Sequence, residues 1–187
     1  MRKELSGKSD HQLMTAVGLG DVSALGLLFE RHSEGVYSLC YRMTGDGSVA
    51  DDLVQESFLR IHRYSSRFEG RAAFSTWLYR LVRNVCLDHL NAVSRAQART
   101  ETLSLISEPG HTPGGDDEVD PRVETLRQAL YGLSAGEREV LVLSRYEGLS
   151  YAEIAEVCET TVGAIKVRAH RAMRALRKRF TELEQAI

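Results

Sequence analysis

The chain has 187 residues, of which 43% are hydrophobic and 27% are charged, and its formal net charge is −2. This balance is usual for a globular protein and excludes only the extreme compositional classes. The length fits one domain or two small ones.

The charge is distributed unevenly along the chain. Acidic residues gather between positions 116 and 120, whereas basic residues gather between positions 60 and 99 and in the last predicted helix. A near-neutral total with separate charged segments fits a protein that presents basic patches to DNA and other surfaces to a protein partner.

The three cysteines, Cys40, Cys86 and Cys158, are far apart and odd in number. Each has apolar helical neighbours, which favours reduced thiols in a cytoplasmic protein. Cys86 and His89 share a helix face, but no second pair has ligand spacing, so we expect no metal and no other cofactor. No apolar run suits a signal peptide or a membrane span, and we expect no membrane insertion.

Four helices are predicted in the first half of the chain. Capping residues and apolar residues at helical period place them at about 9–17, 21–44, 48–61 and 72–90. A polar loop at 65–71 separates the last two. No segment alternates apolar and polar residues, so we predict an all-α fold.

A flexible acidic linker is predicted at residues 94–120. The apolar period weakens there, and the segment is rich in proline, glycine and acidic residues. Such a segment buries too little apolar surface to order itself. We therefore predict two small helical domains, at residues 1–93 and 121–187.

The second domain is predicted to hold four helices, of which the last two form a helix-turn-helix. Ser150 and Glu153 have the spacing of a capping box, and Thr161 can cap the final helix. From Gly163 to Thr181 there are seven basic residues and no acidic ones. A cationic face on the second helix of such a pair suits the major groove of DNA, although a solvated basic surface helix has the same composition.

Four segments together resemble the extracytoplasmic-function (ECF) group of bacterial RNA polymerase sigma factors. The first domain contributes DDLVQESFLR at 51–60 and FSTWLYR at 74–80, followed by Asn84. The second domain contributes GLSYAEIA at 148–155 and VGAIKVR at 162–168. The resemblance covers nearly the whole chain, in the order and spacing of the family.

The resemblance implies a non-enzymatic factor that joins core RNA polymerase and recognises the −35 and −10 elements of a promoter. Contacts with core polymerase are expected from Asp51, Asp52, Gln55, Glu56 and Arg60. Contacts with −10 DNA are expected from Arg67, Phe68, Arg71, Trp77, Arg80 and Asn84. Contacts with −35 DNA are expected from Thr161, Lys166, Val167, Arg168, His170, Arg171, Arg174 and Lys178.

Two residues depart from the family pattern. Glu159 stands where a turn glycine is common. If this turn needs a positive φ, a strained backbone is expected at Glu159, because only glycine adopts positive φ without steric cost. Val167 stands where a small polar residue is common, so contact with a thymine methyl group is expected to replace a hydrogen bond.

Two other functions fit parts of the sequence. A helix-turn-helix regulator that does not join polymerase would leave the motifs at 51–60 and 74–84 without a role. A small enzyme has as its nearest support the acids Asp51, Asp52 and Glu56, without a nucleophile or a phosphate loop, and no small-molecule substrate is expected. The resemblance also implies an anti-sigma factor as a partner.

Overall fold

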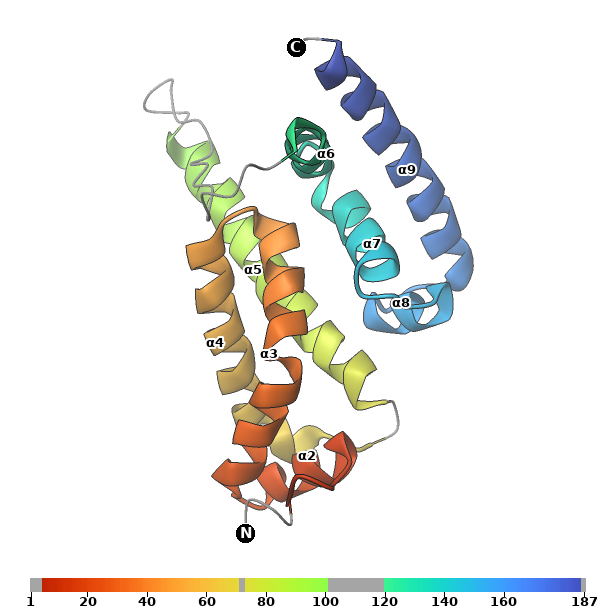
Figure 1. The fold of residues 1–187 in the computed structure, drawn as a ribbon. Coiled ribbons are helices and arrows are strands. Elements are labelled where there is room, and N and C mark those ends of the chain that lie inside the picture. Colours follow the sequence, from red (N-terminus) through yellow and green to blue (C-terminus); the bar gives the residue numbers. More distant parts are fainter. Residues whose placement is uncertain (1–4, 71–72, 101–119, 186–187) are drawn as a thin grey trace.

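The structure is a computed structural model that describes residues 5–70, 73–100 and 120–185 (Figure 1). Throughout these ranges the regular elements are helices, which confirms the all-α prediction. The first domain comprises α2 (Asp10–Gly18), α3 (Val22–Thr44), α4 (Gly47–Tyr64), the short 3-10 helix η1 (Ser65–Arg67) and α5 (Phe74–Thr100). The second comprises α6 (Pro121–Tyr131), α7 (Ala135–Arg145), α8 (Tyr151–Val157) and α9 (Val162–Glu184).

The helix starts follow local capping signals. Ser9 and Ser150 form capping boxes with Gln12 and Glu153, and Asp21 accepts hydrogen bonds from the first turn of α3. Helix α3 ends at Gly45, whose φ of 83° is left-handed, so the chain turns there at little steric cost. These ends lie close to the positions predicted from the sequence.

Helix α5 runs past residue 93, the predicted end of the first domain. No glycine or proline occurs between Arg71 and Glu108, and the added turns contain the good helix formers alanine, arginine and glutamine. Residues 94–100 are therefore helical although they were assigned to the linker. The predicted linker residues 101–119 lie outside the described residues.

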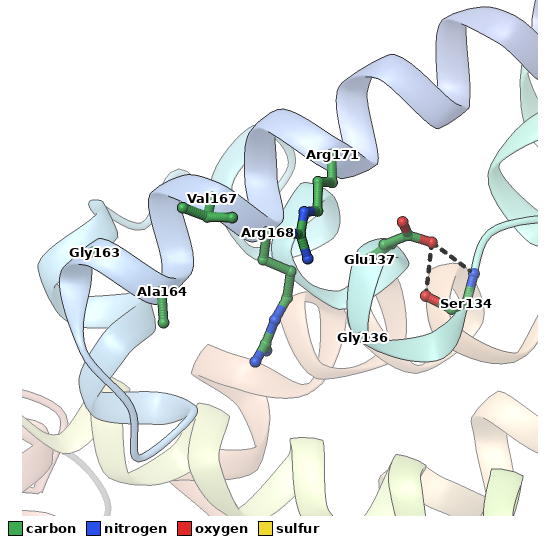
Figure 2. A pocket seen from close by; sticks show the side chains of 8 residues that line it. All are labelled: Ser134, Gly136, Glu137, Gly163, Ala164, Val167, Arg168 and Arg171. Carbon is green, nitrogen blue, oxygen red and sulfur yellow. Dashed lines mark hydrogen bonds between the residues drawn. The ribbon is translucent and has the colours of Figure 1, made fainter.

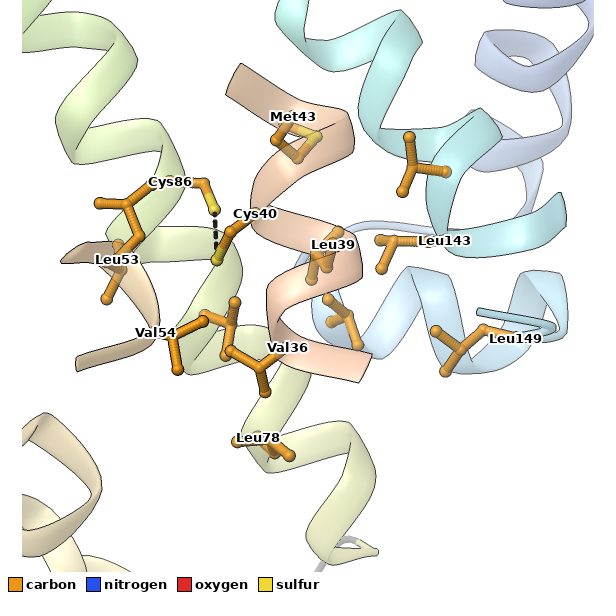
Figure 3. Packing of buried hydrophobic residues seen from close by; sticks show 14 of the residues in the cluster. Val36, Leu39, Cys40, Met43, Leu53, Val54, Leu78, Cys86, Leu143 and Leu149 are labelled. Atoms are coloured by element: carbon orange, nitrogen blue, oxygen red, sulfur yellow. Dashed lines mark hydrogen bonds between the residues drawn. The ribbon is translucent and has the colours of Figure 1, made fainter. Parts of the chain in front are cut away.

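Helices α3, α4 and α5 form the bundle of the first domain, and α2 packs against α3 (Figure 1). The second domain lies against this bundle: α7 contacts α3, and α8 contacts α5. Figure 3 shows Leu39 of α3 beside Leu143 of α7, and both are almost completely buried. The two domains predicted from the sequence thus share one continuous apolar core.

Cys40 and Cys86 are buried free thiols whose sulfur atoms lie 3.7 Å apart in this core (Figure 3). The hydrogen bond with Cys40 and burial both raise the pKa of Cys86. Because a thiolate is the reactive form, these thiols are suited to packing rather than chemistry. None of the helices in the described ranges is both long and apolar enough to cross a membrane.

Candidate nucleic-acid and protein interfaces

Helices α8 and α9 form the predicted helix-turn-helix. The turn between them contains Glu159, whose φ of 52° is the one positive value at a non-glycine residue in the described ranges. Thr161 then caps α9 by accepting a hydrogen bond from the Ala164 N–H at 3.2 Å. Ile165 and Ala169 are buried toward the domain, which fixes the opposite side of α9 outward.

The outward side of α9 carries most of the residues predicted to contact −35 DNA. Val167 is 52% exposed. The other exposed side chains on this helix include Lys166, His170, Arg171, Arg174 and Lys178. Arg168 differs, because its guanidinium lies 3.8 Å from the carboxylate of Glu139 on α7. Arg168 is thus directed toward the protein.

An open groove of about 490 Å³ separates the start of α7 from the first turns of α9 (Figure 2). Val167, Arg168 and Arg171 line one side of it, and the first turn of α7 lines the other. The α7 residues Ser134, Gly136 and Glu137 were not singled out as site residues from the sequence. Ser134 and Glu137 form the capping box of α7, and the place of this helix start beside α9 depends on the tertiary structure.

A second cavity, of about 270 Å³, opens between the end of α4 and the middle of α5. It is lined by Arg60, Tyr64, Arg67, Trp77, Arg80, Leu81 and Asn84. Four of these were predicted to contact −10 DNA, so the fold brings most of that set together. An aromatic wall with several cationic groups suits an unstacked base and its phosphate.

Two members of the predicted −10 set lie elsewhere. Phe68 packs edge-on against Trp77 and Phe74, with ring centroids 5.4 and 6.0 Å away, and thus belongs to an aromatic cluster beside the cavity. Arg71 lies outside the described residues. Tyr64, for which no DNA contact was predicted, lines the cavity instead, and Arg67 stacks over its ring at 5.2 Å from the centroid.

The acidic half of α4 presents the residues predicted to contact core polymerase. Asp51, Asp52 and Gln55 are exposed, as a protein-docking face requires. Arg60 donates hydrogen bonds to Glu56 at 2.6 Å and to Asp88 at 3.0 Å. These bonds raise the pKa of Arg60, and they hold its side chain at the mouth of the second cavity.

Comparison with known proteins identifies the family. A family model for sigma-70 region 2 matches residues 28–96, and one for sigma-70 region 4 matches residues 124–176. The ECF RNA polymerase sigma factor SigW of Bacillus subtilis is 32% identical, covering 88% of this chain and 92% of its own. The chain belongs to the ECF RNA polymerase sigma factor family.

This ECF sigma factor has further relatives of the same kind. The sigma-E factor of Escherichia coli is 33% identical over 90% of this chain and 92% of its own. The RNA polymerase sigma-H factor of Pseudomonas aeruginosa is 31% identical over 96% of this chain and 97% of its own. The family model for region 2 thus spans most of α3 to α5, and that for region 4 spans most of α6 to α9.

Solved structures share its fold. One is the sigma factor RpoE in complex with the anti-sigma factor NepR from Bartonella quintana, with a TM-score of 0.64, 24% identity and coverage of 84% of this chain and 94% of that one. Another is CnrH in complex with the cytosolic domain of CnrY, with a TM-score of 0.66, 24% identity and coverage of 96% and 99%. As a sigma factor, the protein binds core RNA polymerase and promoter DNA.

Proposed function

We propose that this sigma factor divides its work among three surfaces. The exposed acids of α4 dock on core polymerase, the cavity between α4 and α5 holds an unstacked base of the −10 element, and α9 reads the −35 element. The factor acts by binding rather than by catalysis, in the cytoplasm, where core polymerase meets the chromosome.

The observation that carries this proposal is the separation of two DNA-suited surfaces on two domains. The α9 face has no acid between Gly163 and Thr181, so it attracts phosphate along its whole outer side. The α4–α5 cavity instead joins Tyr64 and Trp77 to cationic groups, a combination that favours a single strand over a duplex. A chain that carries one surface suited to duplex DNA and another suited to a single strand fits promoter recognition followed by strand opening.

Transcription with purified core polymerase tests the proposal. We expect this protein to direct initiation from a promoter that contains its −35 and −10 elements. Charge reversal at Asp52 (Asp52→Lys) is expected to abolish binding to core while the isolated factor stays folded, because Asp52 is exposed. A factor that binds promoter DNA but never core polymerase would instead be the helix-turn-helix regulator considered above.

We further propose that an anti-sigma factor controls this protein. The solved structure of RpoE with a bound anti-sigma factor, which has the same fold, supports this by similarity. Purification of the tagged factor from its own uninduced cells is expected to recover an inhibitory protein. Recovery of an inactive factor with no such protein would contradict the proposal.

A further inference from the structure

Helix α2 has no part in the three surfaces described above, although it packs beside the α4–α5 cavity. It lies outside the family model for region 2, which begins at residue 28. The helix contacts α3 and the short helix η1, and its apolar residues Leu13, Met14 and Val17 are buried in the core of the first domain. A helix of nine residues is thus fixed beside the segment that leads into the cavity.

The first residue of α2, Asp10, anchors the helix on α3. One carboxylate oxygen of Asp10 accepts a hydrogen bond from Arg31 at 2.7 Å, and the other lies 2.9 Å from Nε2 of His32. Arg31 also donates to the main-chain carbonyls of Ser6 and Lys8, at 2.7 and 2.9 Å. Because these bonds join both the first turn of α2 and the chain before it to α3, the start of α2 is held in one position.

The last turn of α2 packs on the −10 loop, which we define as residues 65–70. Gly18 faces the main chain of Ser65, and a Cβ atom at position 18 would lie 3.5 Å from the Ser65 carbonyl oxygen. That distance is ordinary van der Waals contact, so the helix lies directly against the start of the loop. Two residues after Ser65, Arg67 lines the α4–α5 cavity. The end of α2 therefore supports the base of one cavity wall.

His11 of α2 contacts the later part of the −10 loop at two points. Its ring lies edge-on against Phe68, with the ring centroids 5.2 Å apart. Nε2 of the same ring occupies the space beside Gly70 in which a Cβ atom would lie. Gly70 also has a φ of 67°, which glycine adopts without steric cost. The loop can thus pass close to His11 because residue 70 has no side chain.

Phe68 connects His11 to the cavity. Its ring packs edge-on against Trp77 at 5.4 Å between centroids, and Trp77 lines the cavity. Arg67, the residue before Phe68, lines it as well. His11 is not among the described residues that line the cavity. It can therefore affect a bound base through its contacts with Phe68 and Gly70.

We propose that α2 supports the −10 loop in the conformation that binds an unstacked base, and that His11 is the positioning residue of this support. This inference rests on the proposed role of the α4–α5 cavity in holding a base of the −10 element. A loop without support must be ordered when the base binds, and the entropy lost in that step weakens binding. Because α2 fixes the loop beforehand, Arg67 and Trp77 are in place before the base arrives.

Binding of a single-stranded −10 oligonucleotide by the holoenzyme tests the role of His11. We expect His11→Ala to weaken binding about twofold to tenfold, the usual effect of removing one aromatic contact. His11→Phe keeps an aromatic ring and is expected to bind nearly as tightly as the wild type. Leu19→Ala is the control at the end of α2, because Leu19 is 86% exposed. Fluorescence anisotropy with a labelled strand measures all three variants, and wild-type affinity in His11→Ala would overturn the proposal.

The salt dependence of the same binding distinguishes support of the loop from a direct contact with DNA. At pH 6 an imidazole bound to a phosphate carries a positive charge, and its removal would reduce the salt slope by about 0.7. Because we expect His11 to act through the loop, the slope should be the same in the wild type, His11→Ala and His11→Phe. A reduced slope in both variants, with weak binding by His11→Phe, would assign His11 to the DNA and overturn its positioning role.

A double-mutant cycle with Gly70 tests the contact itself. Gly70→Ala is expected to weaken binding, because the added methyl group meets the His11 ring and because the backbone has a positive φ. When His11→Ala is combined with Gly70→Ala, the methyl group has room. The combined loss of affinity is therefore expected to be smaller than the product of the two single losses. Single losses that simply multiply would show that the two residues act independently, against the proposal.

Tyr64→Ala separates this inference from the proposed function, because Tyr64 lines the cavity directly. Weaker binding by Tyr64→Ala, together with normal binding by His11→Ala, would overturn the support by α2 alone. Normal binding by both variants would overturn the assignment of the cavity to −10 DNA, and the support of the −10 loop with it.

Discussion

Arg138 of α7 donates a hydrogen bond to the main-chain carbonyl of Met43, in the last turn of α3. The same guanidinium donates to the carbonyls of Tyr131 and Leu133 in its own domain. Burial lowers the pKa of Arg138, since no carboxylate among the described residues pairs with it. One buried cation thus satisfies the otherwise unpaired end of a helix in the other domain.

Loss of Arg138 is expected to reduce the stability of the second domain and of its contact with the first. Arg138→Met keeps the apolar stem but leaves three carbonyls without this donor, at a cost of about 1–3 kcal/mol. Urea denaturation followed by circular dichroism measures this loss in the free energy of unfolding. Arg145→Met, at an exposed position on the same helix, is expected to leave the midpoint nearly unchanged.

Glycine at position 159 is expected to stabilise the chain. Glu159→Gly relieves a left-handed backbone strain of about 1–3 kcal/mol but adds about 0.5–1 kcal/mol of chain entropy on unfolding. The net gain predicts a melting temperature about 2–4 °C higher, measured by calorimetry. Glu156→Gly, within α8, should lower it. A lower melting temperature for Glu159→Gly would show that its contact with Arg80 outweighs the strain.

Tyr64 is expected to contribute to binding of the opened strand. Loss of its ring in Tyr64→Ala should weaken binding of single-stranded −10 DNA by the holoenzyme by about 1–3 kcal/mol, the usual contribution of one stacked base. Tyr64→Phe keeps the ring and should bind nearly normally. Fluorescence anisotropy with a labelled strand measures both. Equal losses in the two variants would assign the effect to the hydroxyl group.

Arg171 and Lys178 are expected to differ in how their loss affects −35 recognition. Arg171 lines the groove beside Val167, where an arginine can contact a guanine edge, so Arg171→Met should cost about 1–3 kcal/mol on the preferred sequence only. Lys178 lies further along α9, and Lys178→Met should weaken all sequences alike and reduce the salt slope by about 1. Competition binding at several salt concentrations distinguishes the two patterns.

The titration of Cys158 is expected to make the fold sensitive to alkali. Burial, helped by the charge of Glu139, raises the pKa of this thiol from 9.0 to about 11. Between pH 9 and about 11 the thiol ionises in the unfolded chain but stays protonated in the folded chain. The free energy of unfolding therefore has its full value below pH 9 and decreases as the pH rises toward 11. We expect a loss of about 1–2 kcal/mol after solvent screening. Urea midpoints across this range, compared with those of Cys158→Ser, measure it.

The helix starts and helix faces were predictable because they depend on interactions between residues close together in the sequence. The helix starts at Ser9, Asp21 and Ser150 depend on side chains that reach only three or four residues along the chain. The apolar face of α9 follows in the same way from the helical period. The extension of α5 to Thr100 was missed because weak apolar periodicity was interpreted as loop, although the residues favour helix.

The sequence by itself determined the helices, the helix-turn-helix and the family, because capping, periodicity and motif order are encoded within short segments. Only the tertiary structure decided that Tyr64 completes the α4–α5 cavity, that Arg168 points to Glu139, and that the two domains pack against each other. The contact from Arg80 to Glu156 joins residues 76 positions apart. Such contacts depend on how whole helices pack, and neither residue's sequence neighbours specify its partner.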